Sequence, residues 1–358
     1  MGTARFDQDK LTAAEHGRHD GENGDRVHAV SIEQVRRYTG AVTARLTADL
    51  LAHAREVLGI HLAGVAEARP LPGAERLRAW LSEGAHGDMG YMAESAVVRA
   101  DPARFLPGAR SVVCVALSYH DAHEPAEPGG PGDRAVVARY ARRRDYHRVV
   151  KRRLVALGRH LAELVPGARW RPAVDSAPLL ERELAWRSGL GWIGRNTCLV
   201  DRRLGSELFL GELVTDVELE PGTPGADHCG TCRACLDACP TGALTAPGVL
   251  DARRCIAYLT IEHRSAFPPA LAGALAPHLF GCDICQAVCP WNRRAAPSCD
   301  PGLAARPRLA SLTTPTLAAL DEPGWQSLAA GTPLRRLSFG RFRRNLAALG
   351  PPATGGAT

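Results

Sequence analysis

The distribution of cysteine constrains this chain more than any other feature of its sequence. Eight of the eleven cysteines lie between residues 229 and 289, in the runs CGTCRACLDACP (229–240) and CDICQAVCP (282–290) and at position 255 between them. The N-terminus lacks the basic-then-apolar order of a secretion signal, and no apolar run is long enough to span a bilayer. We therefore expect a cytoplasmic protein without a membrane segment, in which clustered cysteines bind metal instead of forming disulfides.

The spacing within the two runs is typical of bacterial ferredoxins. In the motif C-x2-C-x2-C-x3-C-P, three cysteines hold one 4Fe–4S cluster and the fourth binds a second cluster. Residues 229–240 match this motif at every position, whereas residues 282–290 lack its first cysteine. Cys255 is the only cysteine between the runs, so it is expected to supply the missing ligand. One cluster is assigned to Cys229, Cys232, Cys235 and Cys289, and the other to Cys239, Cys255, Cys282 and Cys285.

Structural zinc is the alternative, because paired C-x2-C knuckles also bind zinc. A zinc site does not explain the third closely spaced cysteine, the C-P endings or their repetition, so two clusters and electron transfer are favoured. Three cysteines lie outside this region. Cys114, in SVVCVALSY, and Cys198 are interpreted as small core residues, and Cys299 lies in a polar, proline-rich loop without an evident role.

The chain of 358 residues is long enough for two or three domains. Composition and periodicity divide it into a polar extension at 1–40, predicted to be mobile, a mixed α/β domain at 41–221, a ferredoxin-type domain at 222–295, a helical region at 296–350 and a tail at 351–358. The first domain is far larger than an electron carrier needs. The clusters are therefore expected to deliver electrons to a site within it.

Hydrophobic periodicity and turn residues predict the elements of this first domain. They are a helix from Val42 to Gly59, a basic helix over 146–164, a strand in RWRPAVDSAP (169–178), a helix in LLERELAWRSGLG (179–191) and a β-hairpin around the turn at 202–205. Asp175 ends the predicted strand. From the residues alone it is interpreted as the N-cap of the following helix, with a catalytic acid as the alternative.

The glycine-rich segment GLGWIGRN (189–196) does not match a nicotinamide or flavin loop. Such a loop follows a strand and opens a helix, whereas this segment follows a helix. It is interpreted as a tight helix-to-strand turn, with a backbone-lined approach to a large, flat cofactor as the alternative.

Several motifs taken together resemble the epoxyqueuosine reductase family, in order along residues 42–350. They are RYARRRDYH (139–147), VDSAPLLERELAWRSGLGWIGRN (174–196), GSELFLGEL (205–213), the two cysteine runs, CIAYLTIEHR (255–264) and GRFRRNLAALG (340–350). The resemblance implies an α+β protein with a nitroreductase-like, mixed α/β cobalamin-binding domain, a ferredoxin-like double-cluster domain and a short α-helical C-terminal region. It also implies the last step of queuosine biosynthesis, in which the epoxide of epoxyqueuosine at the tRNA wobble position is reduced to queuosine.

The resemblance further implies a cobalamin cofactor and a proton donor. Reduced cobalamin opens the epoxide, the clusters supply electrons, and Asp175, with a pKa raised by an apolar site, protonates the alkoxide. Cofactor contacts are expected from Ala138, Arg139, Tyr140, Asp175, Gly194 and Asn196. The segment DYH (145–147) begins like the D-x-H-x-x-G signature of histidine-ligated cobalamin, but residue 150 is Val. Asp145 and His147 are therefore expected to hydrogen-bond backbone, corrin amides or tRNA, without a cobalt–histidine bond.

Basic residues gather in two stretches, residues 139–153 and PLRRLSFGRFRR (333–344), although the formal net charge is only +6. Alone, either stretch is compatible with a solvated face. With the resemblance, they predict phosphate contacts to a tRNA that carries epoxyqueuosine in its anticodon loop. The residues expected to make these contacts are Arg142, Arg143, Arg144, Lys151, Arg341 and Arg343. The resemblance also implies a monomer that receives electrons from a low-potential donor such as ferredoxin or flavodoxin.

Two other functions remain as alternatives. One is a ferredoxin-type electron-transfer module with a non-catalytic domain, and the other is a cobalamin-dependent reductive dehalogenase that acts on small molecules. The basic stretches and the missing export signal weigh against the dehalogenase. Retention of a corrin by the protein would exclude the electron carrier.

Overall fold

The computed structural model describes residues 32–121, 124, 134–298 and 300–350. The chain divides into two compact units, Met1–Ala41 and Val42–Thr358. The helix predicted from Val42 to Gly59 is present as α1 (Ile32–Glu56), so it begins ten residues earlier than predicted and residues 32–40 are helical. Its last helical residue is Glu56, and Gly59 follows with a left-handed φ of +63°. The predictions for residues 1–31, for Cys299 and for the tail at 351–358 lie outside the described residues.

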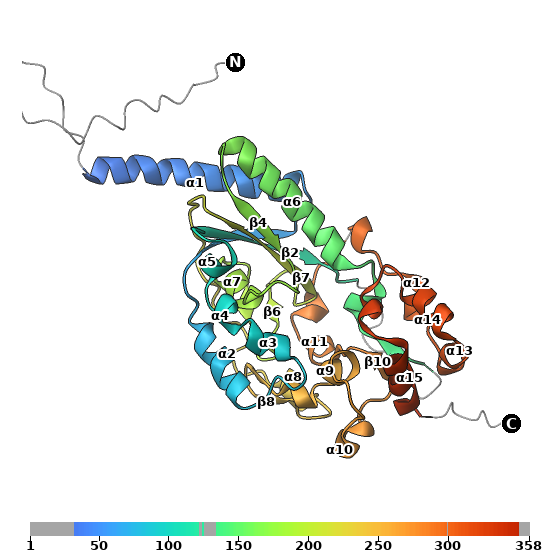
Figure 1. Ribbon diagram of the computed structural model, residues 1–358. Helices are drawn as coiled ribbons and strands as arrows, with labels where there is room; N and C mark the ends of the chain where they lie inside the picture. The colour runs from blue at the N-terminus through green and yellow to red at the C-terminus, as the bar shows by residue number, and fades with distance from the viewer. Residues whose placement is uncertain (1–31, 122–123, 125–133, 299, 351–358) are drawn as a thin grey trace, which may run out of the picture. The chain divides into compact units, whose positions relative to one another are not determined.

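A four-stranded antiparallel sheet lies at the centre of the second unit (Figure 1). Its strand order is β1 (Leu62–Glu67), β2 (Ser111–Ser118), β7 (Leu208–Thr215) and β4 (Trp170–Ala173). Every residue of β2 is buried, as expected for a strand rich in valine, and Cys114 is the core residue predicted. The register places Cys114 opposite Glu212 of β7. A carboxyl group therefore lies in the middle of the sheet.

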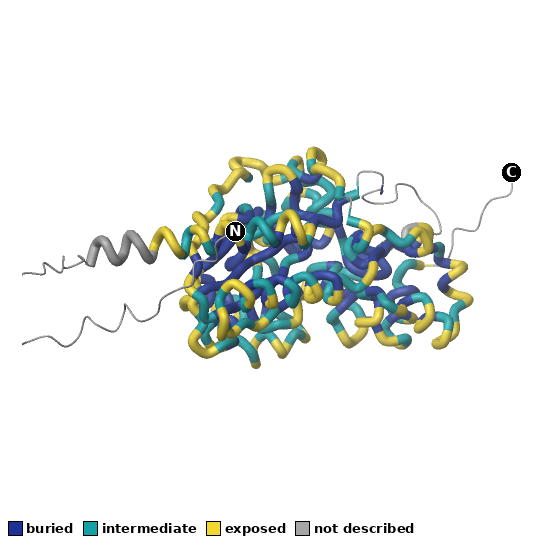
Figure 2. Tube along the Cα trace, turned by 90° about the horizontal axis from the view of Figure 1, so that it is seen from above, coloured by how far each residue is buried: buried dark blue, intermediate teal, exposed yellow. Residues whose placement is uncertain are grey.

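Helices cover both faces of the sheet, and the strands between them form the buried interior (Figure 2). One face packs against α1 and α6 (Tyr146–Leu164), through Leu50 and through Leu154 and Leu157 at helical spacing. Helix α6 spans the residues predicted for the basic helix. The other face packs against α7 (Glu181–Arg187), α4 (Ala96–Arg99) and α5 (Pro102–Phe105).

Short elements make up the cysteine-rich segment that follows the sheet. They are α8 (Ala234–Asp237), β8 (Leu244–Ala246), β9 (Val249–Leu250), η3 (Ala252–Arg254), α9 (Ile256–Ile261), α10 (Pro269–Ala272), β10 (His278–Phe280), α11 (Ile284–Ala287) and η4 (Asn292–Arg294). Helices α8 and α11 carry one cysteine each, Cys235 and Cys285, and contact each other. The two cysteine runs therefore lie side by side. This segment also packs against Trp80 of α2 (Gly73–Ser82) and against Met89, which precedes α3 (Gly90–Glu94).

The C-terminal region is helical, as predicted. Its elements are η5 (Pro301–Leu303), α12 (Pro307–Ala310), α13 (Thr314–Ala318), α14 (Glu322–Ala329), η6 (Pro333–Arg336) and α15 (Phe339–Ala348). They share a core with β10, which pairs in parallel with β3 (Val136–Val137), the strand just before η2 (Arg139–Arg142). Residues 136–142 thus connect the first domain with the cysteine-rich segment and the C-terminal helices. In the described part of the chain, no helix is both long and apolar enough to cross a membrane.

The predicted hairpin around residues 202–205 is wrong. Strand β6 (Leu199–Val200) pairs with β5 (Trp192–Ile193), whereas β7 pairs with β2 and β4. The turn keeps only an isolated bridge between Asp201 and Gly205. The physical reason is that β7 is apolar enough to be buried between two other strands, which favours the sheet centre over a two-stranded ribbon.

Candidate active site and cluster-binding segment

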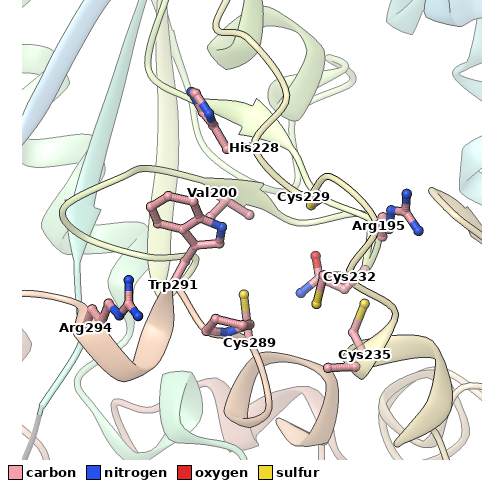
Figure 3. Close-up of a pocket in the computed structure, with 13 residues that line it drawn as sticks. Arg195, Val200, His228, Cys229, Cys232, Cys235, Cys289, Trp291 and Arg294 are labelled. Atoms are coloured by element: carbon pink, nitrogen blue, oxygen red, sulfur yellow. The ribbon is translucent and has the colours of Figure 1, made fainter.

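Four cysteines line one cavity of about 230 Å³ (Figure 3). They are Cys229, Cys232, Cys235 and Cys289, the set predicted for one cluster. The sulfur atoms of Cys232, Cys235 and Cys289 point toward a common space. The indole Nε1 of Trp192 donates to Sγ of Cys229 over 3.4 Å, a contact of the kind that tunes the potential of a cluster. The donor set therefore fits an iron–sulfur cluster.

The other four predicted ligands form a second group, made of Cys239, Cys255, Cys282 and Cys285. Charge interactions link Cys255 to Cys239, and Cys285 to Cys282 and Cys255. The backbone N–H of Ala243 donates to Sγ of Cys239 over 3.3 Å. Among the described residues, no three His, Cys, Asp or Glu side chains converge as a single metal ion would require. These proximities divide the thiols into the two predicted sets, and the assignment of individual ligands stays a prediction.

Cys198 lies next to both groups, which the sequence did not indicate. Charge interactions connect its thiol with members of each group, and burial raises its pKa to about 11. Asn196 lies at the same place, because it lines the first cavity while its Nδ2 is 3.5 Å from the carbonyl oxygen of Cys285. Gly194 lines that cavity too. Of the residues predicted to contact cobalamin, Asn196 therefore lies between the two cysteine groups, and Gly194 lies at the first of them.

Asp175 follows β4 with a left-handed φ of +49°. A residue other than glycine in this conformation costs about 1–3 kcal/mol and needs surrounding contacts to hold it. Its side chain caps no helix, because α7 begins at Glu181 with Leu180 in the N-cap position. The N-cap interpretation is therefore wrong. Oδ2 of Asp175 instead lies 2.9 Å from Nε2 of His147, and 52% of the Asp175 side chain remains accessible.

His147 joins Asp175 to a second carboxylate. Its Nδ1 lies 2.7 Å from Oδ1 of Asp145, which also accepts the backbone N–H of His147 as the N-cap of α6. Burial lowers the pKa of His147, but the hydrogen bonds and charges of Asp175 and Asp145 outweigh it and raise that pKa above its ordinary value. Both ring nitrogens are engaged by carboxylates, so His147 offers neither to a metal in this arrangement.

The pKa of Asp175 shifts in the opposite direction to the one expected. Burial raises it, but the hydrogen bond and charge of His147, together with Tyr146 and Arg336, outweigh burial and bring it below its ordinary value. The expectation of a raised pKa is therefore wrong for Asp175. Arg336 was missed as a site residue, although it lies in the basic stretch 333–344. It pairs with Glu262 at 2.5 Å, and its charge acts on Asp175.

Residues 138–140, predicted to contact cobalamin, adjoin the second cysteine group. The backbone N–H of Arg139 donates to Oδ2 of Asp283 over 2.7 Å, next to Cys282 in the sequence. The Arg139 guanidinium is buried in an ion pair with Glu207 at 2.5 Å, and Ala138 is buried as well. Tyr140 packs against Tyr146, with 6.2 Å between their ring centroids, and interacts electrostatically with Asp175. Tyr140 is therefore the side chain of this segment that faces the Asp175 site.

The six basic residues predicted to contact tRNA are placed in different environments. Arg142 and Arg143 are 2% and 1% exposed, and both pair with Glu124. A direct phosphate contact is wrong for these two, because their charges are already neutralised inside the protein. The other four are accessible to different degrees: Arg144, Lys151 and Arg343 are exposed, and Arg341 is partly buried. For these four the contact stays a prediction.

Comparisons with known proteins agree with this arrangement. The family model "Epoxyqueuosine reductase QueG, DUF1730" matches residues 99–176, and the model "4Fe-4S double cluster binding domain" matches residues 228–292. The cysteine-rich segment is therefore a double-cluster domain, and the zinc alternative is wrong. The epoxyqueuosine reductase of Xanthomonas campestris is 46% identical over 273 residues, which cover 76% of this chain and 77% of the relative.

Two solved structures of epoxyqueuosine reductases are also similar to this chain. An epoxyqueuosine reductase with an epoxyqueuosine-modified tRNA-Tyr stem loop is 29% identical, with a TM-score of 0.77 over 85% of this chain and 80% of the other. The Bacillus subtilis enzyme, with its catalytic aspartate loop swung out of the active site, has the same identity and TM-score, over 85% of this chain and 81% of the other. These similarities confirm the α+β fold and favour neither alternative function. The chain belongs to the epoxyqueuosine reductase family.

Proposed function

We propose that the protein reduces the epoxide of epoxyqueuosine at the wobble position of tRNA to give queuosine, as a cytoplasmic monomer. Family membership supports this reaction, as does the relative bound to an epoxyqueuosine-modified stem loop. The observation that carries the proposal is the chain of Asp145, His147 and Asp175, which brings a transferable proton to an accessible carboxyl group. A protein that only carries electrons does not need such a group.

Cobalamin is the cofactor proposed for this site. When bound, it supplies a strong nucleophile that opens the epoxide. The residues present fit such a group, because Tyr140 and Tyr146 place aromatic rings beside Asp175, on which a large, flat ligand would pack. Tyr140 and Tyr146 would hold it, whereas the backbone N–H groups of Ala138 and Arg139 are already bonded to Phe280 and Asp283.

Asp175 and His147 supply the proton that ring opening requires. At rest the proton is held by the pair on His147, because two carboxylates raise the pKa of the imidazole. When the alkoxide oxygen of the opened epoxide forms, Nε2 of His147 gives its proton to the Asp175 carboxylate 2.9 Å away, and Asp175, on the accessible side of the pair, passes that proton to the alkoxide. His147 is then neutral and regains a proton from solvent before the next turnover.

Electrons reach this site through the two cluster positions. Cys232 of the first group is exposed, whereas the second group adjoins residues 138–140. The first group is therefore the outer one. Arg195 and Arg294 line the outer cavity, and the exposed Arg233 follows Cys232 in the sequence. This positive rim fits an acidic, low-potential donor such as ferredoxin or flavodoxin.

The tRNA surface proposed here lies around the start of α6 and the basic stretch 333–344. Arg144 and Lys151 are exposed on either side of His147 in the sequence, and Arg336 places a positive charge near Asp175. Arginine and lysine at such positions neutralise phosphates. Arg341 and Arg343 would extend this surface along α15.

The test is nucleoside analysis by mass spectrometry. Epoxyqueuosine-containing tRNA is incubated anaerobically with the reconstituted protein, cobalamin and a strong reductant. Queuosine should form only when both clusters and cobalamin are loaded, and the corrin absorbance should stay with the protein through gel filtration. A protein that holds both cofactors and forms no queuosine would overturn the proposal.

A further inference from the structure

Three carboxyl groups lie close together at the catalytic loop, defined here as residues 174–180. They belong to Asp175 on the loop, Glu181 at the start of α7 and Glu212 in the centre of β7. Glu212 is 0% exposed, and neither of its carboxyl oxygens has a hydrogen-bond partner among the described residues. An ionised carboxyl group without partners is strongly disfavoured in such a place. Glu212 is therefore the member of this group that keeps its proton.

Glu181 contacts the loop directly. Its Oε1 accepts the backbone N–H of Asp175 over 2.5 Å. Asp175 has the left-handed φ of +49°, and this hydrogen bond offsets the cost of that conformation. At the other end of the loop, the buried guanidinium of Arg99 donates to the carbonyl oxygen of Leu179 over 3.2 Å. The loop has no helix or strand of its own, so contacts of this kind fix its position.

We propose that Glu181 is a positioning residue that acts as a latch, defined here as the hydrogen bond by which its carboxyl group holds the catalytic loop at the N–H of Asp175. Glu212 is close to Glu181 and stays protonated, so of these two glutamates only Glu181 carries a negative charge. The inference rests on the proposed function, in which Asp175 delivers the proton. The loop of the Bacillus subtilis relative is found swung out of its active site. In this chain the latch holds Asp175 against His147.

The latch depends on pH because Glu181 titrates near neutrality. The groups that act on it from the surrounding elements are Asp175 on the loop, Arg182 on α7, Arg99 on α4, Glu212 on β7, Cys114 on β2 and Tyr146 on α6. Burial, followed by the charge of Asp175, raises the pKa of Glu181 to about 7. Above that pH the ionised carboxylate accepts the N–H more strongly, and below it the neutral acid accepts it more weakly.

Two variants of Glu181 separate a latch from a merely structural residue. Glu181→Ala removes the acceptor, whereas Glu181→Gln keeps an acceptor oxygen without the charge. In the holoenzyme we expect Glu181→Ala to speed hydrogen exchange of loop peptides covering 174–180. It should also lower kcat on the order of 10–100-fold with KM for tRNA nearly unchanged, because the proton donor is displaced. Glu181→Gln should recover most of the loop protection and abolish the rise in rate through pH 7.

Matched controls complete the experiment. Glu212→Gln imitates the protonated acid and should keep near-normal loop protection and rate. Glu163→Ala, at an exposed position on α6, should change neither. Unchanged exchange and rate in Glu181→Ala would overturn the latch, and so would a Gln variant as impaired as the Ala variant. If Glu181→Ala does not fold, the pH profile of Glu181→Gln decides alone. Loop exchange is read without turnover, so a failure of the proposed function remains distinguishable from a failure of the latch.

Discussion

Replacing Asp175 by Asn removes the proton-carrying carboxyl group with little change of shape. In the native protein, Nε2 of His147 contacts Oδ2 of Asp175 over 2.9 Å, and an asparagine oxygen can accept the same hydrogen bond. The amide has no proton to transfer to an alkoxide. Since general acid catalysis is worth about 10²–10⁴-fold, we expect the single-turnover rate of queuosine formation to fall by that factor, or about 2.7–5.4 kcal/mol in the barrier.

The structure also predicts what this variant keeps. Leu180 and not Asp175 occupies the N-cap position of α7, so the substitution removes no helix cap. The thermal midpoint, iron content and corrin retention should therefore stay close to those of the native protein. Asp49→Asn, at an exposed position on α1, is the matched control, because it makes the same chemical change away from the Asp175 site. Near-normal conversion by a fully loaded Asp175→Asn variant would exclude Asp175 as the proton donor.

Three further predictions concern the clusters and the charged surface. Cys255→Ala should lower the iron content from about eight atoms per chain to about four, measured together with acid-labile sulfide, and native iron content in the variant would show that Cys255 is no ligand. Arg144→Gln with Lys151→Gln should weaken tRNA binding and flatten its salt dependence by about one slope unit per lost phosphate contact; an unchanged salt titration would contradict these contacts. Arg294→Glu should slow reduction by flavodoxin but not by dithionite, and equal rates with flavodoxin would remove Arg294 from the donor surface.

Features encoded locally could be predicted from the sequence. Helix α6 occupies the residues predicted, because its N-cap at Asp145 and its apolar spacing lie within the helix itself. The grouping of the cysteines joins residues far apart in the sequence, but it could also be predicted, because the spacing within each run follows the ligand pattern of a double-cluster motif. The strand predicted before Asp175 is present as β4. The predicted N-cap role of Asp175 is wrong, because Leu180 occupies that position.

Features that depend on distant partners could not be predicted. Arg142 and Arg143 belong to a basic run that resembles a solvated surface, and their burial depends on Glu124, which a loop outside that run supplies. The partners of β7 are decided by the burial of a whole sheet, so a local turn at 202–205 could not reveal them. Cys198 reaches both cysteine groups only through the tertiary fold.

The pairing of His147 with Asp175 changes the expected pH dependence of the reaction. The pKa of Asp175 lies below its ordinary value, so Asp175 is almost fully ionised at neutral pH. The proton shared by the pair is therefore carried mainly by His147. It is lost as pH rises through the raised pKa of His147. The rate should therefore fall on the alkaline side of neutrality. Asp145→Asn removes one of the two carboxylates that raise this pKa, so it should move the alkaline limb to lower pH while the rate at acidic pH changes little. An alkaline limb that does not move in this variant would show that a group other than His147 holds the proton.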